Sequence, residues 1–496
     1  MTAVGDRIGT IRDVRIAGPG RELLSGDDAY DVFLDGDAIA DIAPSGALRA
    51  SGEVLDAAGA WLVPGLWDHH VHTVQWALGA EREPLGAAGS AAHAAALMRN
   101  APVLAGDRRV GAGFRDALWP DAPSLELLDA ATGGIPTYLI SADVHSVWLN
   151  SAAFAREGFD ADATGMLRET DAFEISRRLN AASDAGGDAS VARAAREAAA
   201  RGVVGIVDLD MAWNAGAWAR RLAAGFDVLR VDAAVYPDQL DRAIATGLRS
   251  GDMIGSGGLV RVGPLKIITD GSLGTRTAAC SRPYPDGSHG VLSVSPEELA
   301  AFLADATAAG FACAVHAIGD VAVAHALDAF ARTGAAGTIE HAQLVTHADL
   351  PRFARLGVGA SVQPAHALDD RDLATALWSA QTALAYPLRS LVDRGAKLLF
   401  GSDAPVAAMD PWATLAAAVF RTRGEREPWH PEERLDAATA LAASTAGGTA
   451  APARIAPRAL ADLVLCGSDP VAADEPALRE MPVHATLLAG RLTHLA

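Results

Sequence analysis

Residues 61–72 read WLVPGLWDHHVH, an apolar run that ends in two histidines separated by one residue. Side chains alternate between the two faces of a β-strand, so His70 and His72 would project from the same face. Two neutral imidazoles at the end of a buried strand can bind a divalent metal. An isolated pair of this kind is more often two solvated or core histidines, so the remaining sequence has to decide.

Strand-like and helix-like segments alternate through the middle of the chain. In one unit, Ser295 is suited to an N-cap, an apolar face begins at Leu299, Gly310 ends the helix, and His316 ends the next strand. Alternation of this kind is typical of parallel βα units, and eight such strands predict a (β/α)8 TIM-like barrel. The strands we predict are 62–70, 205–210, 228–236, 260–268, 312–316, 338–341, 359–363 and 397–403.

Both chain ends are rich in short strands and turns. A hairpin is predicted around Asp35 and Gly36, and residues 461–465 and 485–492 have a similar character. We therefore predict a small β-sandwich domain built from 1–62 and 450–496, and a hydrolase-type barrel over 63–449. Residues 75–202 do not fit the repeat and predict an insertion after the first barrel strand, with a strand of its own at 137–141.

Charge and composition narrow the class of protein. Half of the 496 residues are hydrophobic, which is enough for a large core. The 41 basic and 61 acidic residues give a net charge of −20, which argues against nucleic acid or an anionic membrane as a partner. A small-molecule substrate remains the expected partner, and the sequence leaves both a monomer and a homo-oligomer open.

The expected compartment is the cytoplasm. The three cysteines, Cys280, Cys313 and Cys466, form no CxxC pair, which argues against a disulfide scaffold and suits a reducing environment. The first residues show no basic region followed by an apolar stretch, and no apolar run approaches the ~18 residues of a membrane span.

Polar residues occupy the ends of several predicted barrel strands. Functional residues of a barrel gather at the carboxyl ends of its strands. One buried histidine there is as readily structural as functional, but the whole set favours a metal centre. Its members are His70, His72, Lys266, His316, His341 and Asp403.

Lys266 is the unusual member of this set, because an ammonium group repels cations and is costly to bury. A desolvated lysine can lose its proton, and the neutral amine could then react with carbon dioxide. The resulting carbamate has two anionic oxygens and could bridge two metals. Alternatively, Lys266 pairs with a carboxylate such as Asp270, and the residues alone leave both readings open.

Six motifs resemble the amidohydrolase superfamily, and within it the branch of YtcJ-like and N-substituted formamide deformylase-like hydrolases. They occur in order along nearly the whole chain, so the combination is far more specific than any one of them. The motifs are PGLWDHHVH at 64–72, DVHSVWLNS at 143–151, KIITDGSLGTRTA at 266–278, VHAIGD at 315–320, IEHAQ at 339–343 and GSDAPV at 401–406.

The resemblance implies a metal-dependent hydrolase in which the six strand-end residues, with Lys266 as a carbamate, bind metal. Two zinc ions are expected, and manganese or iron would also suit the ligands. A bridging hydroxide would then be the nucleophile. Asp403 would take its proton and pass it to the leaving nitrogen as general base and acid.

Candidates for substrate binding lie outside the metal ligands, and each has a structural alternative. His145 and Trp148 would line a pocket or anchor the insertion. Arg276 would meet a substrate anion or pair within its own loop. Gln363 and His366 follow the seventh strand and face the expected mouth.

The leading functional prediction is hydrolysis of a carbon–nitrogen bond, other than a peptide bond, in a small N-acyl or N-formyl amide. The same centre would also hydrolyse an ester, carbamate or lactone. A third hypothesis is a non-catalytic barrel that acts in assembly, which the complete ligand set argues against.

Overall fold

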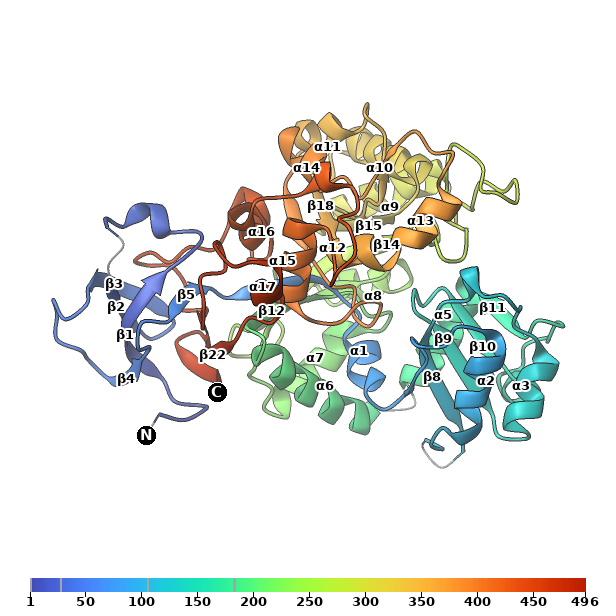
Figure 1. The fold of residues 1–496 in the computed structure, drawn as a ribbon, viewed down its shortest axis with the longest axis horizontal. Coiled ribbons are helices and arrows are strands. Elements are labelled where there is room, and N and C mark those ends of the chain that lie inside the picture. Colours follow the sequence, from blue (N-terminus) through green and yellow to red (C-terminus); the bar gives the residue numbers. More distant parts are fainter. Residues whose placement is uncertain (1, 27–28, 105–106, 182–183) are drawn as a thin grey trace.

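The computed structural model describes the chain apart from residues 1, 27–28, 105–106 and 182–183. A barrel occupies the centre of the molecule, a β-sheet built from both chain ends lies on one side of it, and the five-stranded sheet of the insertion lies on the opposite side (Figure 1). In the described residues, no helix combines the length and apolar character needed to cross a membrane.

Eight parallel strands form the barrel, which confirms the predicted fold. The sheet closes where the segment after β20 meets β6: Val71 and Ala404 form a parallel bridge, and the Asp403 amide donates to the His70 carbonyl at 2.8 Å. In chain order the strands are β6 (Leu66–Val71), β12 (Val203–Asp208), β13 (Arg230–Val235), β14 (Val260–Ile268), β15 (Cys313–Ala317), β16 (Gly337–His341), β18 (Gly359–Val362) and β20 (Leu398–Phe400).

The first predicted strand, 62–70, is two strands in the structure. Gly65 separates β5 (Trp61–Pro64) from β6, and its amide donates to the Asp462 carbonyl at 2.8 Å. A Cβ at Gly65 would lie 2.4 Å from the Val204 side chain, so the close packing of β12 requires glycine here. The apolar run looked continuous because both strands are buried, although β5 belongs to the sheet of the chain ends.

Helices cover the outside of the barrel (Figure 1). The start of α9 is set by a capping box, which Ser295 and Glu298 form as their spacing predicts. The helices from β12 onward are α7 (Asn214–Ala223), α8 (Pro237–Ala245), α9 (Pro296–Ala308), α10 (Asp320–Thr333), α11 (Leu350–Leu356), α12 (Pro364–Asp369), α13 (Arg371–Leu377), α14 (Leu388–Asp393), α15 (Pro411–Phe420), α16 (Ala437–Ala443) and α17 (Glu475–Arg479); two short strands, β17 (Leu344–Val345) and β19 (Leu384–Ala385), pair among them.

Both chain ends contribute to one connected sheet of eight strands. Strand β1 links its two halves, since its first residues pair with β4 and its last with β5. The predicted hairpin is present between β2 and β3, with Gly36 at φ 61 in the turn. The strands are β1 (Ile8–Ile16), β2 (Tyr30–Asp35), β3 (Ala38–Pro44), β4 (Glu53–Asp56), β5, β21 (Leu463–Cys466), β22 (Val483–Leu488) and β23 (Arg491–Leu495).

The insertion has its own five-stranded sheet and two apolar clusters, one around Tyr138 and one around Trp148. The strand predicted at 137–141 is β9. The strands of the insertion are β7 (Glu83–Pro84), β8 (Arg109–Phe114), β9 (Thr137–Ser141), β10 (Ser146–Leu149) and β11 (Met166–Arg168). The helices of the insertion are α1 (Thr73–Gly79), α2 (Ala91–Asn100), α3 (Leu125–Thr132), α4 (Ser151–Glu157), α5 (Thr170–Ala181) and α6 (Asp184–Ala199).

Candidate metal centre

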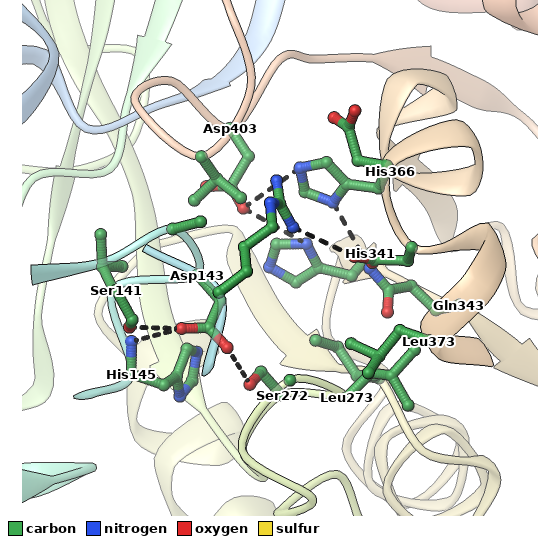
Figure 2. Close-up of a pocket in the computed structure, with 18 of the residues that line it drawn as sticks. Ser141, Asp143, His145, Ser272, Leu273, His341, Gln343, His366, Leu373 and Asp403 are labelled. Atoms are coloured by element: carbon green, nitrogen blue, oxygen red, sulfur yellow. Dashed lines mark hydrogen bonds and ion pairs between the residues drawn. The ribbon is translucent and has the colours of Figure 1, made fainter. Parts of the chain in front are cut away.

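Six polar side chains meet at the carboxyl end of the barrel, where they line a cavity of about 200 Å³. Figure 2 labels two of them, His341 and Asp403, among other residues of the lining. The six come from β6 and the residue after it, from β14, β15 and β16, and from the segment after β20. All six are buried. The structure thus brings together every residue that the sequence predicts as a metal ligand: His70, His72, Lys266, His316, His341 and Asp403.

The Asp403 carboxylate lies among the imidazoles. Its Oδ1 is 3.4 Å from Nε2 of both His70 and His72, and its Oδ2 is 3.9 Å from Nδ1 of His341. Asp403 has φ 58, a conformation that is uncommon outside glycine. This sharp turn directly after β20 aims the carboxylate back toward β6.

A buried carboxylate orients His70. The ring donates through Nδ1–H to Glu340 Oε2 at 2.7 Å, and the Thr338 hydroxyl donates to the other oxygen of Glu340. Because the hydrogen is held on Nδ1, the Nε2 lone pair faces Asp403 and the Nζ of Lys266, which is 3.3 Å away. A carboxylate behind a histidine is a common way to orient a metal ligand.

Gln363 orients His341 in the same manner, because the His341 Nδ1–H donates to Gln363 Oε1 at 2.9 Å. Strand alternation alone would place Glu340 and His341 on opposite faces of β16. His341 has φ 71, so the chain leaves the extended conformation at that residue. The left-handed backbone lets both neighbours reach the same centre.

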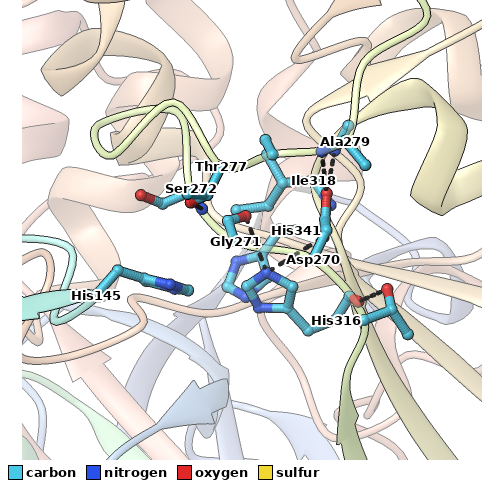
Figure 3. Close-up of polar contacts among 12 residues, drawn as sticks. His145, Asp270, Gly271, Ser272, Thr277, Ala279, His316, Ile318 and His341 are labelled. Atoms are coloured by element: carbon cyan, nitrogen blue, oxygen red, sulfur yellow. Dashed lines mark hydrogen bonds and ion pairs between the residues drawn. The ribbon is translucent and has the colours of Figure 1, made fainter. Parts of the chain in front are cut away.

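Asp270 lies beside His316 and joins the loops after β14 and β15 (Figure 3). Its carboxylate accepts hydrogen bonds from the amides of Ala279, Ile318 and Gly319, and its Oδ1 is 3.5 Å from Nε2 of His316. Burial raises the pKa of Asp270 to about 7. The ion pairs of the described residues do not include Lys266 with Asp270, and the carboxylates whose charges act on Lys266 are those of Glu340 and Asp403, so the carbamate and the pairing with a carboxylate both stay predictions.

The electrostatics favour neutral donors. Burial lowers the pKa of His70, His316 and His341 well below the usual value, and the charge of nearby groups adds to the effect. Burial also lowers the pKa of Lys266 to about 8, although the Glu340 and Asp403 carboxylates oppose it.

These donors fit a divalent metal ion. Neutral imidazoles and a carboxylate are ligands that zinc accepts, and one oxygen or nitrogen atom from each of His70, His341 and Asp403 lies within 4.8 Å of the others. The described residues also offer no hydrogen-bond partner to the buried Nδ1 of His72. Several neutral nitrogen donors close together are typical of a metal site, whereas a core stabilised by hydrogen bonds does not need them.

His145 reaches the cavity from the insertion. Its Nδ1–H donates to Glu169 Oε2 at 2.8 Å, and its ring lies 5.7 Å from that of His316. Burial disfavours the charged ring, but the Glu169 and Asp143 carboxylates outweigh it and raise the pKa of His145. The same bond lowers the pKa of Glu169 against the opposing effect of its burial.

His366 also lines the cavity, as predicted for a residue at the mouth. Its ring stacks on His341 at 6.4 Å, its Nε2 is 3.9 Å from Asp403 Oδ2, and Gln343 Nε2 lies 3.4 Å from its Nδ1. Gln363 is absent from the described lining, since its amide serves to orient His341. Its contact in the structure is with a predicted ligand, and its contact with substrate stays a prediction.

The structure places two residues predicted to bind substrate among other neighbours. Trp148 is fully buried on β10 within the apolar cluster of the insertion, packed with Met98 and Leu139, and is not among the described residues that line the cavity. Arg276 is half-exposed and pairs with Asp286 at 3.3 Å, which is the alternative of pairing within its own loop. The positions of Trp148 and Arg276 inside the motifs do not indicate which residues surround them in the fold.

Several site residues were missed. Glu340 and Gln343 stand inside the IEHAQ motif and Asp143 inside DVHSVWLNS, so proximity to motif histidines could have indicated them. Glu169 and the Arg115–Asp370 pair, whose charged atoms are 3.5 Å apart, carry no such signal. Arg115 lines the cavity from the insertion and Asp370 lines it from the barrel, whereas Glu169 contacts His145.

Comparisons with known proteins agree with this geometry. Residues 53–494 match the model of the amidohydrolase family. The chain is 27% identical over 459 residues to Protein LONG AFTER FAR-RED 3 of Arabidopsis thaliana, covering 83% of this chain and 78% of that protein. It is 24% identical over 485 residues to YtcJ of Bacillus subtilis (strain 168), whose name assigns it provisionally to the amidohydrolases, covering 89% of this chain and 90% of YtcJ.

A shorter match relates the chain to the N-substituted formamide deformylase of Arthrobacter pascens, at 26% identity over 258 residues, or 48% of this chain and 46% of that enzyme. The crystal structure of an uncharacterized metal-dependent hydrolase from Pyrococcus horikoshii superposes with a TM-score of 0.77 at 25% identity, over 94% of this chain and 99% of that one. The chain therefore belongs to the amidohydrolase family, in the branch of YtcJ and the formamide deformylase, and is a metal-dependent hydrolase.

Proposed function

We propose that this protein hydrolyses a carbon–nitrogen bond, other than a peptide bond, in a small N-acyl or N-formyl amide. The observation that carries the proposal is the position of Asp403. Its Oδ1 is equidistant, at 3.4 Å, from Nε2 of His70 and of His72, at the inner end of the cavity. A carboxylate at that point can take a proton from an attacking water and deliver it to a leaving nitrogen.

The metal we propose is a pair of zinc ions held by the four histidines, Asp403 and a carbamate formed on Lys266, with manganese or iron as alternatives. When bound, such ions lower the pKa of a coordinated water and polarise a carbonyl group. The buried Lys266, with its pKa lowered to about 8 by burial, can supply the neutral amine that carbamate formation needs.

The protein's own residues then orient the metal ligands and transfer the proton. Glu340 and Gln363 fix the tautomers of His70 and His341, so that Nε2 of each ring carries the free lone pair, and that of His70 faces Asp403. Asp403 moves the proton, which matters most for an amide because an amine leaves readily only after protonation. His366, with Nε2 at 3.9 Å from Asp403 Oδ2, lies within reach of that carboxylate on the outer side.

The cavity walls support a small, largely apolar substrate. The lining includes aromatic and aliphatic side chains from both the insertion and the barrel, and Leu273 and Leu373 lie next to each other in Figure 2. A relative named as a formamide deformylase supports the carbon–nitrogen class. The three cysteines are free and buried, which suits the cytoplasmic location that we propose.

The test is turnover of N-acyl, N-formyl, carbamate, ester and lactone compounds by protein loaded with zinc, with and without bicarbonate. We expect amides to be turned over best and zinc content to rise with bicarbonate. Metal below about half an ion per chain under all conditions would contradict the centre. Preference for esters or lactones would replace the carbon–nitrogen assignment.

Asp403→Asn tests the proton transfer. We expect kcat to fall about 10²- to 10⁴-fold while the zinc content is retained. Asp372→Asn is the matched control, because Asp372 also lines the cavity but at an exposed position where it pairs with Arg426. Near-normal turnover by Asp403→Asn would refute the role of Asp403.

A further inference from the structure

A polar network joins the insertion to the loop after β14. Asp143 Oδ1 accepts from Ser141 Oγ at 2.5 Å, and its Oδ2 accepts from Ser272 Oγ at 2.7 Å, across the boundary between the insertion and the barrel (Figure 2). Glu169 Oε1 likewise accepts from the hydroxyl of Thr277 at 2.6 Å. Two buried or half-buried carboxylates of the insertion are thus tied to one loop of the barrel.

His145 is held between these two carboxylates. Its amide donates to Asp143 Oδ1 at 3.2 Å, and its ring donates through Nδ1–H to Glu169 Oε2 at 2.8 Å. The Glu169 amide in turn donates to the His145 carbonyl at 2.9 Å. The amide, the carbonyl and the Nδ1–H of His145 are therefore all hydrogen-bonded within the network, and the far edge of the ring is not.

The local backbone shows that this placement is imposed. Val144 and Glu169 both have positive φ, at 56 and 50, which is unfavourable for a β-branched residue and uncommon for glutamate. Strained conformations persist where the surroundings determine them, and they are often found at functional sites. Here they flank the one histidine that the insertion adds to the cavity lining described above.

The free edge of the imidazole faces the reaction centre. Nδ1 is bound to Glu169, so Nε2 lies on the edge that points toward His316 and His341 (Figure 3). The ring is buried, lines the cavity and rests edge-on against Phe173 at 5.0 Å. An imidazole fixed in this way can only serve a group inside the cavity.

We propose that His145 is a catalytic residue that binds the scissile amide group of the substrate through Nε2, and that Glu169 is the residue that positions it. The inference rests on the proposed hydrolysis of an acyl compound at this centre. An amide offers both an acceptor oxygen and an N–H donor, so Nε2 finds a partner in either protonation state of the ring. The insertion is accordingly part of the catalytic site and not only a cover over it.

The first test compares His145→Ala and His145→Gln with the unaltered zinc-loaded protein. We expect kcat/KM on the best panel substrate to fall about 10- to 100-fold in both variants, with zinc content unchanged. His430→Ala is the matched control, because His430 Nδ1 makes the same 2.8 Å contact with a glutamate, Glu432, but on the surface. Loss of zinc, or kcat/KM within about twofold of normal, would overturn the proposal.

Glu169 is tested by rescue. Glu169→Ala removes the acceptor of the Nδ1–H bond and should lower kcat/KM about tenfold, whereas Glu169→Gln keeps an acceptor oxygen and should restore most of it. A merely structural role would lower thermal stability in step with activity and would show no such rescue. Equal kcat/KM for the two variants contradicts positioning by Glu169.

A binding measurement separates this inference from the proposed function. Acetohydroxamic acid presents a carbonyl and an N–H group to a zinc centre without needing turnover. We expect its Kd, measured by calorimetry on zinc-loaded protein, to rise about fivefold or more in His145→Ala and to be unchanged in His430→Ala. If the panel shows no amide turnover but this rise occurs, only the substrate class is wrong; an unchanged Kd together with unchanged kcat/KM refutes the role of His145.

Discussion

At the scale of single residues, the donors of this centre depend on partners that fix which nitrogen is free. Glu340 holds the hydrogen on Nδ1 of His70, and Gln363 does the same for His341. Without them each imidazole would divide its population between two tautomers, and only one of these presents a lone pair to the metal. The partners therefore contribute to metal affinity without touching the metal.

Glu340→Gln measures this contribution. The amide keeps the shape of the carboxylate but loses the charge that stabilises the His70 tautomer, so zinc affinity should fall about 10- to 100-fold. Competition with a fluorescent chelator gives the affinity. Glu433→Gln is the control, because Glu433 is also buried and accepts two hydrogen bonds from Ser390, on the outside of the barrel. Equal zinc affinity in Glu340→Gln and the unaltered protein would contradict the argument.

The sequence predicted the donors well and their partners poorly, for a physical reason. A donor occupies a strand end, and strand ends can be located from the hydrophobic pattern. A partner such as Glu169 is brought to the site by a residue with positive φ that directly follows β11 of the insertion, and no periodicity marks that position. Trp148 shows the opposite error, since it lies inside a motif but packs in a core.

At the scale of elements, the close approach of β6 and β12 decides where the first two histidines lie. Gly205 on β12 faces Trp67 on β6, and a Cβ at Gly205 would lie 2.2 Å from Cε2 of the indole. The strands are also in register at these two residues. Glycine thus lets the indole fill the space that a side chain on β12 would occupy.

Gly205→Ala should therefore destabilise the protein. The indole is buried, so overpacking should cost about 1–3 kcal/mol of unfolding free energy. Urea denaturation followed by circular dichroism gives the value. Gly134→Ala is the matched control, because a Cβ there meets no atom within 4 Å. A midpoint for Gly205→Ala equal to that of the control would show that the strands can separate without cost.

Boundaries of elements were harder to predict than their order. The predicted strand at 397–403 shortens to β20 because the chain turns at Asp403, whereas 260–268 is the full extent of β14. The two strands differ in the path of the chain directly after them. Where the chain turns back at Asp403 to bring the carboxylate to the centre, the extended conformation ends early. Sequence patterns do not encode that turn.

At the scale of the whole molecule, the sheet of the chain ends is attached closely to the barrel. Gly65 alone separates β5 from β6, the Asp462 carboxylate accepts two hydrogen bonds from Arg230 on β13 at 2.6 and 3.1 Å, and Leu488 packs against Trp67. The insertion is attached both through the polar network at its inner edge and through α1 and α6, whose residues Ala77 and Val191 belong to the apolar cluster of the barrel. The sheet and the barrel should therefore unfold as one cooperative unit.

Asp31→Asn tests this coupling from a distance. Asp31 is buried in the sheet and accepts hydrogen bonds from the amides of Asp13 and Gly46 and from the hydroxyl of Ser45, at 2.9 to 3.0 Å. Burial opposes ionisation, but these bonds outweigh it and lower the pKa of Asp31. A lowered pKa means that its stabilisation is present above the unfolded pKa of about 3.9 and is lost as the pH falls below it.

We expect Asp31→Asn to cost about 1–3 kcal/mol of unfolding free energy at pH 7, and the difference from the unaltered protein to shrink as the pH is lowered below about 4. Asp35→Asn, at the exposed end of the same strand, should cost little at any pH. If sheet and barrel are one unit, release of zinc and loss of circular dichroism will move to the same lower urea midpoint. Zinc release at an unshifted midpoint would show instead that the sheet unfolds independently, because the barrel and its metal centre would then keep their stability when the sheet has lost its own.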